Sequence, residues 1–149
     1  MSTFRTLLVP HDFSPHSDAA LQTALELARL FGARIRLLHV FESHPAVFEP
    51  YGILPAEPHL SEIPAAARSR LQRELDRVVE AGLEGEAVVR EGSAVDEIMA
   101  EITDGAVDLL VMGTRGLTGL PHTLLGSVAE RTIRLAPIPV LTLKADAED

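Results

Sequence analysis

Short apolar runs alternate with segments of helical periodicity along this chain, and that alternation restricts its fold more than any other feature. The runs predicted as strands are residues 5–10, 34–41, 86–92, 107–113 and 138–143. Parallel strands need a long crossover between them, and a helix usually supplies it. The sequence therefore predicts a single α/β domain over residues 1–149, with an open parallel sheet and helices on both faces.

The first predicted helix carries clear start and stop signals. Ser14 is placed to cap it, and Pro15 falls at the first helical position, where a missing N–H costs nothing. Gly32 is expected to end the helix in a left-handed conformation. The apolar stripe consists of Ala20, Ala24, Leu27 and Phe31, widened by Leu21, Leu25 and Ala28.

Three further helices are predicted from apolar spacing and caps. The second is marked by Leu71, Leu75, Val78 and Val79 and ends near Gly82 and Gly85. The third covers residues 93–102 with Ser93 as its cap, and the fourth covers 123–136. The apolar face predicted for the fourth helix contains Leu125, Val128, Ala129 and Ile133.

Residues 43–64 interrupt the alternation. Half of the ten prolines fall there, so we expect an irregular excursion rather than a domain boundary, because neither flank could fold alone. Residues 107–113 form the most hydrophobic run and are expected to be central, whereas 86–92 are expected at the sheet edge. The acidic end, 145–149, is expected to fray.

Charge and composition exclude several classes of function. The net charge of −9 disfavours nucleic acid as a partner, because an acidic surface repels phosphate backbones. No apolar run reaches the roughly 18 residues that span a bilayer, and residues 1–5 lack the apolar core of a signal peptide. With no cysteine for disulfides, we expect a cytoplasmic protein without a membrane partner.

Two strand ends carry residues suited to ligand binding. Pro10, His11 and Asp12 follow the first predicted strand, and Gly-Thr-Arg-Gly (113–116) follows the fourth. Open parallel sheets bind ligands beyond the carboxyl ends of their strands, where the strand order reverses. If these two strands are neighbours across such a point, both segments face one crevice.

The segment after the fourth predicted strand suits a phosphate ligand. Gly113 and Gly116 lack a Cβ where a backbone must turn or approach an anion, and Arg115 supplies a cation. Gly126, Ser127 and Val128 lie near a predicted helix N-terminus, where unpaired N–H groups favour anions. The glycines are equally compatible with a bare turn that binds nothing.

An acidic residue at the first strand end would complement that phosphate site. Asp12 could accept hydrogen bonds from an adenine amino group or a ribose hydroxyl. The six histidines suggest a metal, but none of their spacings resembles a zinc signature. We therefore expect no metal held by protein side chains alone.

The spacing of these residues resembles the ATP-binding branch of the universal stress protein family. Gly113, Gly116 and Gly126-Ser127 match its G-x2-G-x9-G-[S/T] pattern, and the segments LLVPHDFSPHSDAALQTALELA and LLGSVAERTIRLAPIPVLTL match its first and last elements. The resemblance covers essentially the whole chain. It implies a Rossmann-like, five-stranded sheet of order 3-2-1-4-5 with four helices, and a homodimer paired through the last strand, between Ile138 and Leu143.

The resemblance also implies a ligand and its contacts. The ligand would be ATP, ADP or AMP, with Mg²⁺ or Mn²⁺ on the phosphates. Carried over by position, the binding residues are Asp12 and the Val40 backbone at the adenosine; Gly113, Gly116, Gly126, Ser127 and Val128 at the ribose and phosphates; and Pro10, His11, Met112 and Arg115 around them. Such a protein would act as a dimeric stress-response sensor or regulatory module.

This chain departs from the family pattern inside the glycine loop. Leu117 follows Gly116 where many members carry a basic residue, and Pro121-His122-Thr123 lies further on. Fewer cations should weaken the retention of a triphosphate relative to AMP or ADP. Two alternatives stay open: slow ATP hydrolysis, for which the loop offers His122 alone as a base, and a protein-interaction module that uses residues 43–64 to capture an unknown partner.

Overall fold

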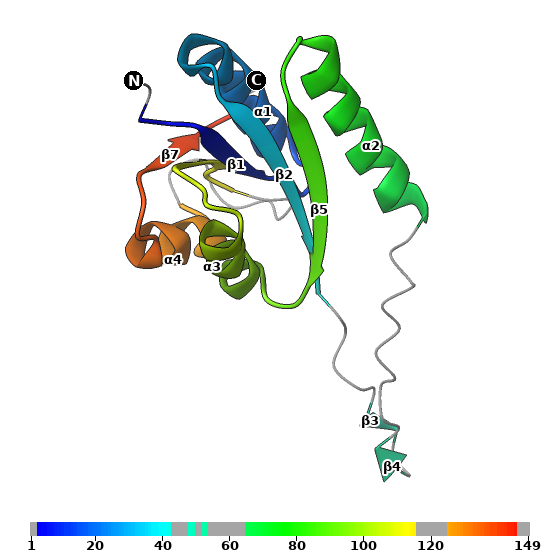
Figure 1. The fold of residues 1–149 in the computed structure, drawn as a ribbon. Helices are drawn as coiled ribbons and strands as arrows, with labels where there is room; N and C mark the ends of the chain where they lie inside the picture. Colours follow the sequence, from blue (N-terminus) through cyan, green and yellow to red (C-terminus); the bar gives the residue numbers. More distant parts are fainter. Residues whose placement is uncertain (1–2, 43–47, 50–51, 54–64, 116–124, 146–149) are drawn as a thin grey trace.

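The computed structural model describes residues 3–42, 48–49, 52–53, 65–115 and 125–145 (Figure 1). Its elements are β1 (Thr6–Pro10), α1 (Pro15–Phe31), β2 (Arg34–Phe41), β3 (Phe48–Glu49), β4 (Gly52–Ile53), α2 (Ala65–Glu80), β5 (Gly85–Glu91), α3 (Ala94–Asp104), β6 (Leu109–Gly113), α4 (Ser127–Leu135) and β7 (Val140–Leu143). No helix in these described ranges is long and apolar enough to cross a membrane.

Five parallel strands form the sheet, in the order β5-β2-β1-β6-β7. Counted along the chain, this is the predicted order 3-2-1-4-5, so the fold prediction is confirmed. β5 is at the edge, as expected. β6 is an interior strand, but the middle position belongs to β1, which pairs with β2 on one side and β6 on the other. The strand order therefore reverses between β1 and β6.

Helices cover both faces of the sheet (Figure 1). α1 and α2 pack on one face, where alternate strand residues such as Leu7, Val9 and Leu37 are buried. α3 and α4 pack on the other face against Leu8 and Leu38. Side chains along a strand alternate between faces, so each buried strand supplies both cores.

Local signals placed α1 correctly. Ser14 is the N-cap, and its side chain accepts a hydrogen bond from the Ser17 N–H. Pro15 occupies the first turn, and Gly32 ends the helix with φ of 66°. The prediction for α3 is less accurate, because Ser93 stands at the N-cap position but its side chain makes no capping hydrogen bond.

The predictions for the apolar faces of α2 and α4 are partly wrong. Val79 is 60% exposed, because it lies about 100° around the helix from buried Val78. α4 begins at Ser127, not at residue 123, and buries Ala129 and Thr132. Three residues of its predicted apolar face are instead 36–45% exposed: Leu125, Val128 and Ile133.

Two chain segments differ from the irregular structure expected of them. Within residues 43–64, β3 and β4 pair as a short antiparallel ladder, and the rest of this excursion lies outside the described residues. The tail is anchored at its first residue, because the Ala145 N–H donates to His16 Nδ1 at 2.9 Å. Residues 146–149 lie outside the described part.

Candidate functional site

A cavity of about 310 Å³ lies at the carboxyl ends of β1 and β6, where the strand order reverses. This volume falls at the lower end of the range typical of small-molecule sites. Ten of the eleven sequence-predicted site residues line the cavity: Pro10, His11, Asp12, Val40, Met112, Gly113, Arg115, Gly126, Ser127 and Val128. The eleventh, Gly116, lies outside the described residues, as do Leu117 and His122.

Six further lining residues were missed by the sequence reasoning: Ser17, Leu38, Ala94, Ile98, Thr114 and Ala129. Leu38 could have been found, because it lies two residues from Val40 and therefore on the same face of β2. Ala94 and Ile98 come from α3, which follows the edge strand β5. No local signal places that helix over the cavity.

One wall of the cavity is apolar. Leu38, Ile98 and Met112 are almost completely buried beneath it, and Val40 lies beside them. These side chains come from β2, α3 and β6 and offer no hydrogen-bonding group. The wall therefore suits a flat, weakly polar part of a ligand, such as a heterocyclic base.

Asp12 lies on the β1 side of the cavity, and Ser14 and Ser17 fix its side chain. Its Oδ1 accepts hydrogen bonds from the Ser14 N–H at 3.0 Å and the Ser17 hydroxyl at 2.6 Å. Burial raises the pKa of Asp12, but these hydrogen bonds outweigh it and hold the pKa below its ordinary value. Asp12 is therefore ionised at neutral pH, and Oδ2 has no hydrogen bond to any described residue.

α4 begins at the opposite rim of the cavity. Gly126 is its N-cap, and no side chain caps this end. The first N–H groups of a helix have no partner within it, and here they belong to the cavity residues Ser127, Val128 and Ala129. In contrast, Ser14 caps the start of α1 with its own side chain. Of these two helix starts, only that of α4 lacks a capping side chain among the described residues, so its N–H groups are placed to bind an anion.

Two glycines at this rim have structural reasons for lacking a side chain. A Cβ on Gly113 would lie 2.7 Å from His16 Cβ and 2.8 Å from the His16 carbonyl carbon, so β6 could not approach α1. A Cβ on Gly126 would lie 3.0 Å from the Thr114 carbonyl oxygen, which accepts the Gly126 N–H. Close packing of backbone thus accounts for both residues independently of any ligand.

We expect Gly113→Ala to lower the free energy of unfolding by about 1–3 kcal/mol, because the α1 backbone cannot move aside without disturbing the core. Urea denaturation of the ligand-free protein measures this loss. An alanine variant as stable as the original chain would contradict the packing explanation.

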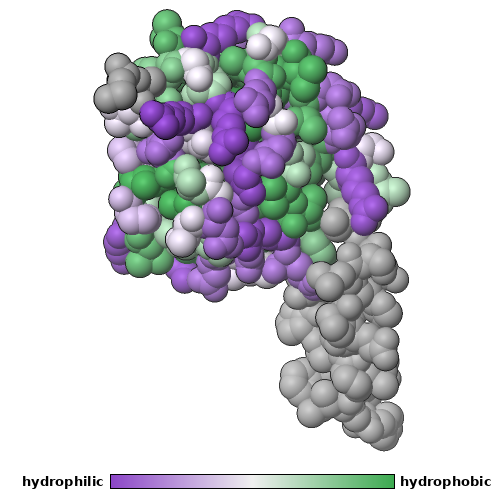
Figure 2. Space-filling view, in the orientation of Figure 1, coloured by the Kyte–Doolittle hydropathy of each residue, from purple (hydrophilic) through white to green (hydrophobic). Residues whose placement is uncertain are grey.

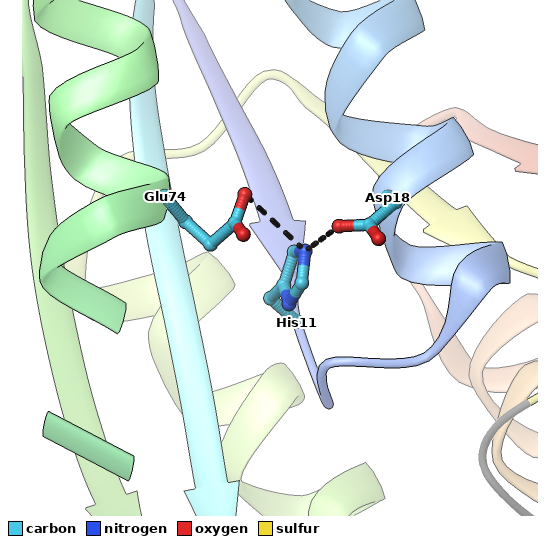
Figure 3. Close-up of side chains that lie close together, drawn as sticks. All are labelled: His11, Asp18 and Glu74. Atoms are coloured by element: carbon cyan, nitrogen blue, oxygen red, sulfur yellow. Dashed lines mark hydrogen bonds and ion pairs between the residues drawn. The ribbon is translucent and has the colours of Figure 1, made fainter. Parts of the chain in front are cut away.

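His11 lies close to Asp18 and Glu74, and the three side chains form a cluster (Figure 3). Its Nε2 lies 3.1 Å from Asp18 Oδ1 on α1 and 3.8 Å from Glu74 Oε2 on α2. The His11 side chain is completely buried. Its Nδ1 accepts the Phe13 N–H at 3.0 Å, so the proton of the neutral ring is assigned to Nε2, which donates to Asp18.

Three potential metal ligands meet in this cluster, since the nearest ligand atoms of His11, Asp18 and Glu74 lie within 4.8 Å of one another. A metal ion would need the lone pair of Nε2, but that nitrogen carries the proton. Arg77 already contacts both carboxylates, at 2.7 Å from Glu74 Oε2 and 3.6 Å from Asp18 Oδ1. We therefore interpret the cluster as an ion-pair network.

His39 is not among the residues that line the cavity. Its neighbours Leu38 and Val40 line the cavity, whereas the His39 ring packs on Phe13 with centroids 4.7 Å apart. Its Nδ1 donates to the His11 carbonyl oxygen at 2.8 Å. The alternation along β2 places His39 on the α1 and α2 face.

The fold and cavity together define a doubly wound α/β domain with a cavity at its switch point, where such domains bind ligands. Comparison with known proteins specifies this class further. The model of the universal stress protein family matches residues 3–144, and the chain belongs to this family. A universal stress protein of Methanocaldococcus jannaschii is 34% identical over 145 residues, which cover 95% of this chain and 82% of that protein.

Solved structures show the same fold. The chain resembles a second Methanocaldococcus jannaschii universal stress protein with a TM-score of 0.82 and 25% identity, covering 98% of this chain and 99% of the other. It also resembles a universal stress family protein of Arabidopsis thaliana with AMP bound. That TM-score is 0.67, with 25% identity over 96% of this chain and 93% of the other.

Proposed function

We propose that this protein binds an adenine nucleotide in the switch-point cavity and acts as a dimeric stress-response sensor or regulatory module. One observation carries the proposal: the cavity joins an apolar wall, an ionised carboxylate and an uncapped helix N-terminus. A nucleotide has matching parts in the same order, namely a base, a nucleoside with donor groups and a phosphate chain. The AMP bound to the Arabidopsis thaliana relative supports this ligand class.

The adenosine would occupy the side formed by β1, β2 and α3. Leu38, Ile98 and Met112 would cover the base, and the Val40 backbone would hydrogen-bond its edge. Asp12 Oδ2 would accept from a ribose hydroxyl or an amino group. These roles use the oxygen that the Ser14 and Ser17 hydrogen bonds leave available.

The phosphates would lie at the start of α4. The N–H groups of Ser127, Val128 and Ala129 would donate to phosphate oxygens, together with the Ser127 hydroxyl and Arg115. Mg²⁺ or Mn²⁺ would bind the phosphate oxygens rather than a protein site. We propose binding rather than hydrolysis. Among the described residues, His11 cannot activate water because both its ring nitrogens are already hydrogen-bonded. His122, the one base that the loop offers, lies outside the described residues.

The proposed dimer would use β7 and α4. β7 is an edge strand, and none of its four residues is fully buried. The neighbouring α4 region exposes Leu125, Val128, Ile133 and Leu135 by 36–57%. Figure 2 shows apolar side chains among hydrophilic ones on the side where α4 lies. Pairing of two chains between Ile138 and Leu143 would cover this surface.

Calorimetric titration with ATP, ADP and AMP tests the proposal. We expect saturable binding by nucleotide-stripped protein and its loss in Ala94→Phe. Ala94 is the first residue of α3 and lines the cavity, so a phenyl ring there would occupy the space of the ligand. Ala65→Phe is the matched control, because Ala65 is the first residue of α2, is exposed and does not line the cavity.

The two variants separate a blocked cavity from a damaged fold. Circular dichroism should show both variants folded, with nucleotide affinity unchanged in Ala65→Phe. Absence of binding to the original chain at millimolar nucleotide would overturn the proposed function. Equal affinities for Ala94→Phe and the original chain would place the ligand elsewhere.

A further inference from the structure

Buried His11 connects the candidate nucleotide cavity to the ion-pair network of Asp18, Glu74 and Arg77. It lines the nucleotide cavity and also a smaller one of about 210 Å³, which Phe13, Asp18, Arg70, Arg73 and Glu74 also line. It immediately precedes Asp12, the carboxylate proposed to contact the adenosine. A change in the His11 ring could therefore be transmitted to the cavity through one peptide unit.

The turn that follows His11 is strained. Phe13 has φ of 67°, in the left-handed region that residues with a Cβ rarely adopt. Four contacts hold it there: the N–H bond to His11 Nδ1 at 3.0 Å, ring packing on His11 and on His39, and the Arg70 guanidinium 4.5 Å above the ring. Asp12 lies inside this turn, so its position depends on the Phe13 conformation.

The first of these contacts requires an unprotonated nitrogen. Nδ1 can accept the Phe13 N–H while it carries a lone pair, but an imidazolium ring is a donor at both nitrogens. Protonation would place two N–H groups 3.0 Å apart and facing each other. The hydrogen bond that opposes the strain at Phe13 would then be lost.

We propose that His11 is a proton-sensitive positioning residue: protonation of its Nδ1 releases the turn that carries Asp12 and thereby weakens nucleotide binding. This inference rests on the proposed function, and it adds regulation by pH to that site. By linkage, a nucleotide that requires the turn held by the Phe13–His11 hydrogen bond also disfavours protonation of the His11 ring.

Charged groups of both signs surround the ring. Asp18 on α1, Glu74 on α2 and Asp12 favour the imidazolium. Arg77 of α2 contacts Glu74 and Asp18, and Arg70 and Arg73 line the same small cavity as His11. The His39 ring of β2 packs on Phe13, and its Nδ1 donates to the His11 carbonyl oxygen. Burial has the largest effect and lowers the pKa of His11 below its ordinary value of 6.5, against the opposing effects of Glu74 and Asp18.

The direction of this pKa shift determines the pH range of the effect. The pKa of His11 in the folded chain is below that in the unfolded chain. The neutral ring therefore contributes stability to the fold above pH 6.5, and this contribution is lost as the pH falls through the lowered pKa. The pKa of Asp12 is lowered from 3.8, so its contribution is lost at still more acidic pH.

Calorimetric titration with ATP between about pH 7.5 and about pH 5 tests the inference in the original chain and in His11→Asn. Asparagine can place its side-chain oxygen near the position of Nδ1 and does not titrate in this range. In the original chain we expect the Kd to rise by up to about tenfold per pH unit below the His11 pKa. Titration of the ATP phosphates affects both proteins equally, so the ratio of their Kd values isolates His11.

A direct readout accompanies the titration. Nitrogen NMR of ¹⁵N-histidine-labelled, nucleotide-free protein should show His11 with an unprotonated Nδ1 near pH 7.5 and a pKa below 6.5. ATP should lower that pKa further. Glu74→Gln removes a carboxylate that favours the imidazolium, so it should move the loss of affinity to lower pH. This variant tests the inference if His11→Asn does not fold.

The outcomes distinguish this inference from the proposed function. A proton on Nδ1 near pH 7.5, or identical pH dependence of the Kd in the original chain and His11→Asn, would overturn the inference and leave nucleotide binding intact. Absence of binding at every pH would overturn both.

Discussion

Replacing Glu101 by alanine should lower the free energy of unfolding by about 3–5 kcal/mol, because it removes a buried carboxylate that accepts charged hydrogen bonds from two arginines. The Glu101 side chain is fully buried between α3 and the sheet. One carboxylate oxygen accepts from Arg36 Nε on β2, and the other accepts from Arg90 Nε on β5 at 2.6 Å. Urea denaturation at fixed protein concentration measures the change.

Asp104 provides a matched control on the same helix. It pairs with Arg90 at 2.8 Å, but its side chain is 63% exposed. Solvent screens an exposed pair, so Asp104→Asn should cost less than about 1 kcal/mol. Similar costs for Glu101→Ala and Asp104→Asn would show that burial does not set the strength of this network.

Replacing Asp12 by asparagine should weaken ATP binding by about 10- to 100-fold, since hydrogen bonds to a charged group contribute roughly 1.5–3 kcal/mol. The amide retains an oxygen that can accept from Ser14 and Ser17. It loses the negative charge that the hydroxyl or amino donors of the ligand would meet. Calorimetric titration near pH 7.5 measures the affinity.

Asp96→Asn controls for the change in net charge. Asp96 lies in the first turn of α3, is exposed and does not line the cavity. Its replacement should leave the Kd unchanged within about twofold. If Asp12→Asn bound ATP as tightly as the original chain, Asp12 would have no contact with the ligand.

Most of the candidate site could be predicted because its residues follow strand ends. A parallel sheet brings these ends to one edge, so Asp12 after β1 and Gly113 at the end of β6 had to lie close once the strands were neighbours. Family resemblance supplied the strand order that sequence periodicity alone left open. The contributions of Ala94 and Ile98 could not be predicted, because the position of α3 depends on packing against distant strands.

The structural role of a residue was harder to predict from the sequence than its position in the fold. Gly113 looked like a residue selected for a turn or an anion, but the His16 backbone fills the space beside it. Val128, Ala129 and Ile133 were predicted to lie on one apolar face of α4. Ala129 is buried as predicted, but Thr132 is buried in place of the other two. Periodicity finds an apolar stripe without showing which part of it another element covers.

The sequence by itself determined the order of strands and helices and the cap of α1. Those features arise between near neighbours, such as Ser14 with Ser17 or the left-handed Gly32 after Phe31. The tertiary structure alone decided that Glu74 of α2 lies close to His11, and that Glu101 accepts hydrogen bonds from Arg36 and Arg90. These contacts join residues far apart in the chain, and they exist because strand order and helix packing bring those elements together.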